Sequence, residues 1–164
     1  MGDDAPQNLL QLRLLGGFRA DYSGQRVTVA NRKCQALLGI LSLSEDMTCS
    51  RERLRGLLWS EVDEKRAQNN LRQCTHILAE KVFGPLGFEG FHSDRMTLSL
   101  DPAQVTCDVL RVKGAIENGE VDDALASNPA LFDEMFDGLE MTDPALLQKP
   151  CWLYEAPPHL TSYI

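Results

Sequence analysis

The segment that decides the fold lies in the middle of the chain, where residues 50–59 read SRERLRGLLW and residues 65–78 read KRAQNNLRQCTHIL. Apolar residues in the second stretch recur at steps of four, three and four, which is the spacing of one helix face. They are Ala67, Leu71, Cys74 and Leu78. In the first stretch the apolar stripe is Leu54, Leu57 and Leu58, followed by Trp59 as a large plug. The two stretches therefore predict two short helices in tandem.

The opposite face of the second predicted helix is polar. It carries Lys65, Asn69, Arg72, Gln73 and His76. Arg pairs well with guanine, and Asn and Gln pair well with adenine, so this combination is typical of a helix that reads DNA. On an arbitrary surface helix the same residues would more often be a solvated face. The order of the surrounding elements decides between the two interpretations.

Each side chain on this face has an expected partner. Arg72 is expected to contact guanine, Asn69 and Gln73 adenine, and His76 a base edge or a phosphate. Lys65 and Arg66 lie near the start of the helix and are expected to contact phosphates.

Both predicted helices have recognisable ends. Ser50 is a suitable N-cap for the first helix. Asp63 and Glu64 are expected in the first turn of the second helix, where acidic residues suit the helix dipole. Gly84-Pro85 then ends that helix.

Three arginines, Arg51, Arg53 and Arg55, cluster at the start of the first helix. Arg51 and Arg53 are expected to hold DNA phosphates, because the N-terminal amides of a helix also favour anions. Ion pairs with Glu52 inside the helix are an equally weighted alternative.

Alternating residues before this segment predict three short antiparallel strands. The alternating residues are Leu10, Leu12, Leu14, then Phe18, Ala20, Tyr22, then Val27 and Val29. Ser23-Gly24 is expected to form the turn between the second and third strands. From Arg32 to Leu43 the period becomes helical, with Asn31 as the expected N-cap.

After the helices, Phe88–Phe91 and Met96–Leu100 flank His92-Ser93-Asp94-Arg95, which predicts a hairpin with Met96, Leu98 and Leu100 facing inwards. Arg95 lies at or beside the hairpin tip, where it is expected either to reach the DNA or to remain a solvated turn residue. Three strands, three helices and a hairpin are the order of a winged helix-turn-helix. The expected fold is therefore α+β, with an N-terminal antiparallel sheet and a C-terminal hairpin wing.

The winged-helix unit is expected to span residues 9–100, after a disordered N-terminus at 1–8. Asp101-Pro102 marks a boundary, and helical periodicity beyond it predicts a partial α-helical, TPR-like segment at 101–145. Residues 146–164 contain three prolines and match neither a helix nor a repeat.

The formal charge of the chain is -8, and its distribution is uneven. Residues 1–100 contain 13 Lys and Arg against 12 Asp and Glu, whereas residues 101–164 contain 3 against 12. The first part is nearly neutral and can still bind phosphates where its cations cluster, because counterion release depends on local contacts. The acidic part is expected to contact proteins instead of DNA.

Other classes of protein find little support. No apolar run approaches the roughly 18 residues of a membrane span, and the start of the chain lacks the features of a secretory signal, so a cytoplasmic location is expected. The five cysteines have no metal-knuckle or disulfide spacing, and Cys34 and Cys74 are expected to be reduced core residues. Catalytic residues, metal and cofactors are all expected to be absent, because no phosphate loop, hydrolase or kinase motif occurs.

The chain also resembles a known family. The carrying motifs are residues 12–16 (LRLLG), 32–33 with 36–38, 50–54, 58–59 and 69–73 (NNLRQ), which resemble the OmpR/PhoB-type winged-helix domain. Residues 105–109, 119–124 and 136–144 resemble the opening of the bacterial transcriptional activator domain that follows it in the antibiotic regulatory proteins. That activator domain normally continues for many more helical turns, and Trp152-Leu153 comes later than the family pattern expects.

The leading hypothesis is a sequence-specific transcription regulator, an activator that binds promoter DNA as two or more copies. The resemblance implies head-to-tail binding on direct repeats, and the acidic segment would serve dimerisation, regulation or contact with RNA polymerase. The alternative is a winged-helix protein-interaction module that binds no DNA. Salt dependence of binding to duplex DNA distinguishes the two.

Overall fold

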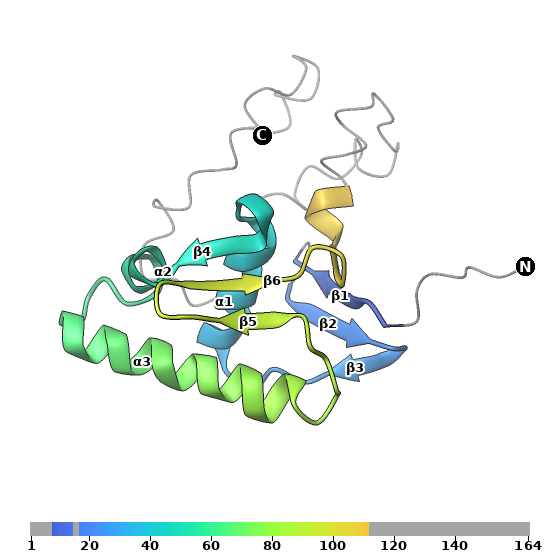
Figure 1. Ribbon diagram of the computed structural model, residues 1–164, viewed down its shortest axis with the longest axis horizontal. Helices are drawn as coiled ribbons and strands as arrows, with labels where there is room; N and C mark the ends of the chain where they lie inside the picture. The colour runs from blue at the N-terminus through green and yellow to red at the C-terminus, as the bar shows by residue number, and fades with distance from the viewer. Residues whose placement is uncertain (1–7, 15–16, 112–164) are drawn as a thin grey trace, which may run out of the picture.

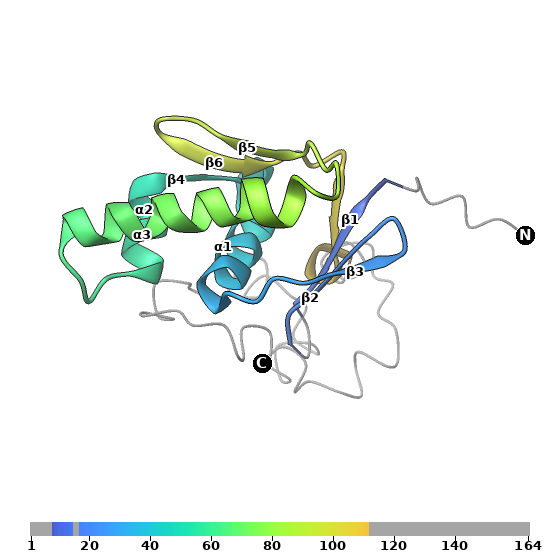
Figure 2. The same cartoon turned by 90° about the horizontal axis from the view of Figure 1, so that it is seen from below.

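The computed structural model describes residues 8–14 and 17–111. In this part of the chain one small sheet, which contains the hairpin, covers one side of a group of three α-helices, and a second small sheet lies at one end of the group, as Figures 1 and 2 show. The N-terminal strands lie at one end of the molecule, and the long helix and the hairpin extend towards the other. The strand-helix-hairpin order is the one that the sequence predicts.

The first sheet contains β1 (Leu10–Arg13), β2 (Arg19–Tyr22), β3 (Gln25–Val27) and β7 (Val105–Cys107), in the order β3-β2-β1-β7. The three predicted antiparallel strands are confirmed. Ser23 and Gly24 form the turn between β2 and β3, and both have positive φ, as a tight hairpin turn requires. Strand β7 runs parallel to β1, so the sheet extends beyond residue 100, where the sequence placed the end of the winged-helix unit.

The helices are α1 (Arg32–Leu43), α2 (Arg51–Leu58) and α3 (Glu64–His76), and α3 continues as a π-helical segment, Ile77–Phe83, that ends at Gly84. Side-chain oxygens cap each α-helix: Asn31 caps α1, Ser50 caps α2 and Asp63 caps α3. The predicted caps of α1 and α2 are confirmed. Asp63 lies one position before the helix and accepts a hydrogen bond from the Arg66 amide at 2.8 Å, so it acts as a cap and not as a first-turn residue.

The second sheet contains β4 (Thr48–Ser50), β5 (Phe91–Ser93) and β6 (Thr97–Leu100), in the order β4-β6-β5. The hairpin β5–β6 is the predicted wing, but its first strand begins at Phe91 instead of Phe88. The sequence did not predict β4. This strand is only three residues long and has one buried residue, Cys49, which is too few to show an alternating pattern.

The prediction that Met96 faces inwards is wrong, because its side chain is 73% exposed. Met96 lies in the turn before β6, where the Asp94 carboxylate accepts a hydrogen bond from its amide at 2.8 Å. The strand alternation therefore begins only at Thr97, and Leu98 and Leu100 are buried as predicted.

A common core joins both sheets to the three helices. The predicted core residues Trp59 and Phe83 are both buried, as are Cys34 and Cys74. Phe83 packs on Phe88 and Phe91, with ring centroids 4.9 and 5.5 Å apart, and thereby ties the end of the long helix to the start of the wing.

The disordered N-terminus predicted at residues 1–8 lies almost entirely outside the described residues, as do most of the helical segment predicted at 101–145 and all of the tail at 146–164. Within the described ranges, no helix has the length and apolar character needed to cross a membrane.

Candidate nucleic-acid interface

Helix α3 has a buried face and an exposed face. Ala67, Leu71 and Cys74 are each no more than 4% exposed and pack into the core. The residues of α3 that the sequence predicts to contact DNA are all exposed: Lys65, Arg66, Asn69, Arg72, Gln73 and His76. The apolar stripe thus fixes the helix rotation so that its polar residues face solvent.

The exposed side chains of α3 have no partners inside the described part of the chain. None of these six side chains forms a hydrogen bond or ion pair with residues 8–14 or 17–111, although the backbone amide of Arg66 is used for the cap. Within these ranges, therefore, no contact has to be broken before their donors reach an external ligand.

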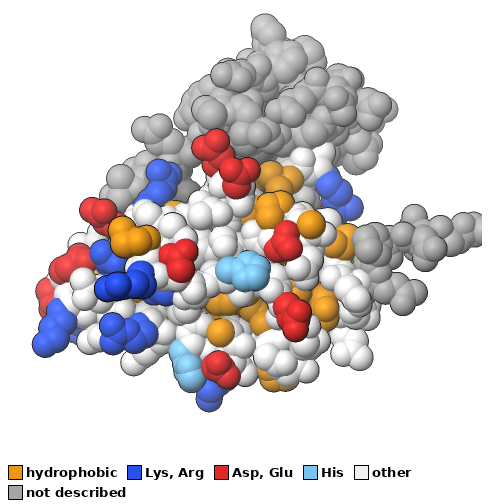
Figure 3. Space-filling model, in the orientation of Figure 1, with side chains coloured by type: hydrophobic (Ala, Val, Ile, Leu, Met, Phe, Trp, Pro, Cys, Tyr) orange, Lys and Arg blue, Asp and Glu red, His pale blue; other side chains and the backbone are white. Residues whose placement is uncertain are grey.

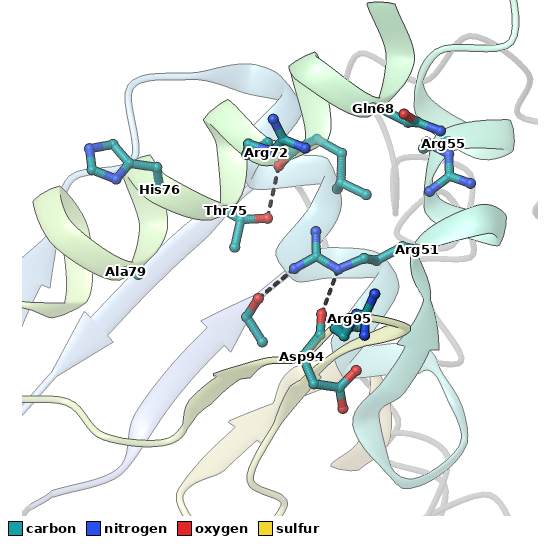
Figure 4. A pocket seen from close by; sticks show the side chains of 11 residues that line it. Arg51, Arg55, Gln68, Arg72, Thr75, His76, Ala79, Asp94 and Arg95 are labelled. Atoms are coloured by element: carbon teal, nitrogen blue, oxygen red, sulfur yellow. Dashed lines mark hydrogen bonds between the residues drawn. The ribbon is translucent and has the colours of Figure 1, made fainter. Parts of the chain in front are cut away.

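A groove of about 790 Å³ separates α3 from the start of α2 and the wing (Figure 4). Four arginines line it. Two lie on α2, one on α3 and one in the wing turn: Arg51, Arg55, Arg72 and Arg95. Gln68, Thr75 and His76 also line it on the α3 side. We call this feature the arginine groove. Its shape and charge suit an anionic chain lying between a helix and a hairpin.

Arg51 holds the wing against α2. Its Nε donates to the Asp94 carbonyl oxygen at 2.7 Å, and its Nη2 donates to Ser93 Oγ at 2.5 Å (Figure 4). The Arg51 backbone amide also donates to the Met96 carbonyl oxygen at 2.8 Å. Arg51 therefore has a positioning role in the wing that its sequence context did not indicate.

Arg55 is oriented by an acidic residue on α3. Its Nε lies 2.8 Å from Glu64 Oε1, an ion pair whose angles are not those of a hydrogen bond. Gln68 Nε2 donates to the same Glu64 oxygen at 3.3 Å. Because Glu64 is largely exposed, this ion pair contributes little to stability, and its main effect is to direct Arg55 along the groove.

The only carboxylate lining the groove, among the residues described, is that of Asp94. It accepts hydrogen bonds from the amides of Thr97 and Met96 and from the Thr97 hydroxyl. These bonds, with a smaller contribution from the nearby Arg51 cation, hold the pKa of Asp94 below its ordinary value. Asp94 therefore stays ionised and holds the wing turn, and the groove has an excess of positive charge because four arginines line it against this one carboxylate.

The surface view shows the same distribution. In Figure 3 most Lys and Arg side chains gather at the end of the molecule where α2, the start of α3 and the wing turn lie. Acidic side chains are interspersed among them, so the patch is mixed and not uniformly basic. Such a surface would recognise an anionic ligand by the positions of individual cationic side chains more than by its total charge.

The predicted site residues fall into two groups. Arg51, Arg72, His76 and Arg95 meet in the arginine groove. Lys65, Arg66, Asn69 and Gln73 lie on α3 outside the groove, and Arg53 is exposed on α2 away from it. Arg72 and His76 belong to both the outer face of α3 and the groove wall.

The sequence interpretation missed Arg55 and Gln68 as groove residues. Arg55 was noted in the cluster with Arg51 and Arg53, yet it is Arg55 and not Arg53 that shares the groove with Arg51. The available signal was spacing, because residues four apart on a helix share a face and residues two apart do not. The same rule applies to Gln68 and Arg72 on α3.

Neither a Cys–His nucleophile pair nor a cluster of metal ligands is assembled in the described ranges. Cys74 is buried and His76 is exposed, so they cannot act together as a nucleophile and base. No three His, Cys, Asp or Glu side chains from residues 8–14 and 17–111 come together as metal ligands.

No family model matches the chain, and no curated protein matches it. Among solved structures, Mycobacterium tuberculosis EmbR in complex with a low-affinity phosphopeptide has a similar fold, with a TM-score of 0.57 and 20% sequence identity. The match covers 79% of this chain and 34% of the EmbR chain, so this chain spans about a third of the length of the protein it matches. Together with the observed topology, this likeness confirms the winged-helix fold.

Proposed function

We propose that the chain is a sequence-specific DNA-binding regulator of transcription, an activator that places α3 in the major groove and the β5–β6 wing on the adjacent backbone or minor groove. One observation carries the proposal. The exposed face of α3 presents Arg, Asn and Gln side chains that have no partner among the described residues, beside a groove lined by four arginines.

The dimensions of a helix support this placement. The major groove of B-DNA is about 12 Å wide and admits one α-helix with its side chains. Helix α3 with its π-helical extension runs from Glu64 to Phe83, and its outer face is free of other described elements along Lys65, Asn69, Arg72 and His76. A helix with this exposure can enter the groove without rearrangement of the core.

The side chains divide into two roles. Asn69, Arg72 and Gln73 are proposed to read base edges, with Arg72 on guanine and the two amides on adenine. Lys65 and Arg66, near the positive end of the helix, and Arg53, at the start of α2, are proposed to contact phosphates. His76 is proposed to contact a base edge or a phosphate.

The arginine groove would receive the backbone of one DNA strand between α3 and the wing. Arg55, Arg72 and Arg95 line it, and Arg95 at the wing turn is exposed. Arg51 would act mainly by fixing the wing, since two of its side-chain donors are already engaged there. Arg95 would then lie over the phosphates or enter the minor groove.

The broader role follows from the family resemblance and the EmbR-like fold. We infer binding by a homodimer or a tandem oligomer on repeated half-sites, with residues beyond 100 serving protein contacts, RNA polymerase among them. We also infer that the chain is not an enzyme, requires no cofactor and acts in the cytoplasm, where promoter DNA is found.

Binding of genomic fragments at several salt concentrations tests the proposal. Selected fragments should share a motif, and log affinity should fall linearly with log salt, with a slope of about -0.9 for each phosphate contacted. Arg26→Ala is a matched control, because Arg26 is an exposed arginine on β3, and β3 lies at the opposite end of the molecule from the start of α3 and the wing turn. It should leave binding to a selected fragment unchanged, whereas Arg72→Ala should weaken it.

A chain that binds no duplex at any salt concentration would contradict the proposal and favour the protein-interaction module. Binding without a shared motif would contradict sequence specificity while leaving the phosphate contacts in place.

A further inference from the structure

Two buried cysteines meet behind the DNA-facing side of α3. Cys34 lies in the first turn of α1, and its Sγ is 3.9 Å from the carbonyl oxygen of Cys74. Both thiols are reduced. The contact joins the two helices whose packing sets the orientation of the proposed recognition helix.

Cys74 borders a small pocket that opens between α1, α3 and the end of α2. The pocket has a volume of about 210 Å³ and is lined in part by Lys33, Trp59, Asn70 and Gln73. A water molecule occupies about 30 Å³ of liquid, so an oxidant only slightly larger than water has room beside the thiol. Lys33 is fixed there, because its Nζ donates to the Leu58 carbonyl oxygen at 2.7 Å and lies 6.0 Å from the Trp59 ring centre.

The surroundings of Cys74 favour its thiolate. The hydrogen bond from Cys34 lowers the pKa of Cys74, and the Lys33 cation lowers it further against the opposing effect of burial. The same hydrogen bond, with burial, raises the pKa of Cys34, which keeps its proton. Burial raises the pKa of Cys49 and of Cys107. Among the described cysteines, Cys74 is therefore the one set up to react, since the thiolate is the nucleophile.

We propose that Cys74 is a peroxide-sensitive modification site and that Cys34 resolves its oxidised form as a disulfide between α1 and α3. The Cys74 sulfur attacks one oxygen of hydrogen peroxide, the O–O bond breaks, and the departing hydroxide takes a proton to leave as water. The product is a sulfenic acid on Cys74.

The second step uses the neighbouring thiol. Cys34 sulfur attacks the Cys74 sulfur, an S–S bond forms, the S–O bond breaks, and the hydroxide leaves as a second water with the Cys34 proton. Two thiols and one peroxide thus give one disulfide and two waters. Cys34 Sγ already lies 3.9 Å from the backbone carbonyl oxygen of Cys74, so the S–S bond of about 2.05 Å would form by a shift of two helices that are in contact at this point.

The shift would act on the proposed DNA interface, and this consequence rests on the proposed function. Cys74 directly follows Gln73 and lies two residues after Arg72 on α3. A covalent bond at this point changes how α3 sits on α1, while base readout requires side chains held within about 0.5 Å of their productive positions. Oxidation should therefore weaken DNA binding, and reduction should restore it.

The chemical part of the proposal is tested without DNA. The reduced chain is treated with hydrogen peroxide, remaining thiols are blocked with iodoacetamide, and peptides are mapped by mass spectrometry. We expect a Cys34–Cys74 disulfide, with the loss of two hydrogens, before Cys49 or Cys107 is modified. Oxidation of Cys49 or Cys107 ahead of this pair, in chain that stays folded by circular dichroism, would overturn the proposal.

Variants separate the roles of the two thiols. In Cys34→Ala, Cys74 should stop at the sulfenic acid and react with dimedone, whereas the matched buried control Cys49→Ala should still form the disulfide. If Cys34→Ala does not fold, Cys34→Ser provides the same test. Absence of dimedone labelling at Cys74 in a folded variant would contradict its assignment as the reacting thiol.

The regulatory part is measured by anisotropy of a labelled promoter fragment. Peroxide should reduce the affinity of the wild-type chain, dithiothreitol should restore it, and Cys34→Ala should not form the reversible disulfide-locked state. Disulfide formation in a chain that never binds DNA would remove the proposed function and leave the redox chemistry intact. DNA binding that is unaffected by a quantitatively formed disulfide would overturn the regulatory consequence alone.

Discussion

The two faces of α3 differ in whether their side chains have contact partners within the described chain. The inner face is apolar, buried and packed against the core, and its contacts are complete within the described chain. The outer face is polar and exposed, and its side chains have no partner there. One thirteen-residue helix therefore carries both a folding surface and a surface whose contacts are still to be made.

This difference teaches that stability and recognition can be separated by residue on the same helix. Loss of an inner side chain should lower the free energy of unfolding, whereas loss of an outer one should change only what the helix binds. Arg51 combines both roles. Two of its side-chain donors hold the wing turn beside the outer face of α3, and it also lines the arginine groove.

The largest effect is expected on the inner face. Leu71 is 1% exposed, and Leu71→Ala should lower the free energy of unfolding by about 2–5 kcal/mol through lost burial and the cavity left behind. Urea unfolding measures it. The matched outer-face control, Asn69→Ala, should stay within about 0.5 kcal/mol of the wild type. Similar destabilisation by both variants would break the comparison.

Arg72→Ala should have the largest effect on the outer face. We expect a loss of about 1–3 kcal/mol in binding to a selected fragment and a relaxed base preference at one position, with little change in stability. Competitive binding to a set of single-base variants of the fragment measures both. A uniform loss on selected and random duplexes would instead place Arg72 on a phosphate.

Arg51→Ala is expected to act through the wing. Removing two side-chain hydrogen bonds at the surface should cost about 1 kcal/mol of local stability and speed amide exchange at Asp94 and Thr97. DNA affinity should fall as a result of the looser wing. Arg51→Lys keeps the charge but not the forked donor geometry, so it should resemble Arg51→Ala if positioning matters and the wild type if charge alone matters.

Much of this arrangement could be predicted from the sequence because it depends on local pattern. The stripe of Leu71 and its neighbours fixes a helix rotation by spacing alone, and the exposed set on the opposite face follows from it. Asn31 and Ser50 were recognisable as caps because they are short polar residues directly before a periodic segment.

The remaining features depend on contacts between distant segments. Strand β4 and strand β7 are each three residues long and are defined by pairing with β6 and β1, not by their own pattern. The groove partners of Arg55 and the wing contacts of Arg51 join residues of α2 to α3 and to the hairpin. Met96 was misplaced because an alternating pattern does not reveal where a turn ends and a strand begins.

Lys65→Ala is expected to have a smaller effect, of a different kind. Lys65 is exposed near the start of α3, and its removal should weaken selected and random duplexes alike. The slope of log affinity against log salt should become shallower by about 1. Lys81→Ala removes an exposed lysine from the π-helical extension and serves as the control. An unchanged slope for Lys65→Ala, or equal changes for both variants, would remove Lys65 from the phosphate contacts.

The smallest expected effect is that of acidic pH on the wing turn. The pKa of Asp94 is lowered mainly by the amides of Thr97 and Met96, then by the Thr97 hydroxyl, with a lesser contribution from Arg51. A carboxyl whose folded pKa lies below its unfolded value stabilises the fold above the unfolded pKa and loses that effect as the pH falls through the folded pKa. The turn should therefore hold at neutral pH and loosen only in strong acid.

Carbon-13 NMR titration of the Asp94 carboxyl should find its pKa below the ordinary value of 3.8. Arg51→Ala should move that pKa slightly upwards, because the nearby cation is lost. Asp101 provides the internal control: the Gln104 side chain and then the Ala103 amide lower its pKa, so the Arg51 change should not move it. An Asp94 pKa at or above 3.8 would mean that the carboxylate does not hold the turn. The Arg51 contacts alone would then hold the wing in its place beside the outer face of α3.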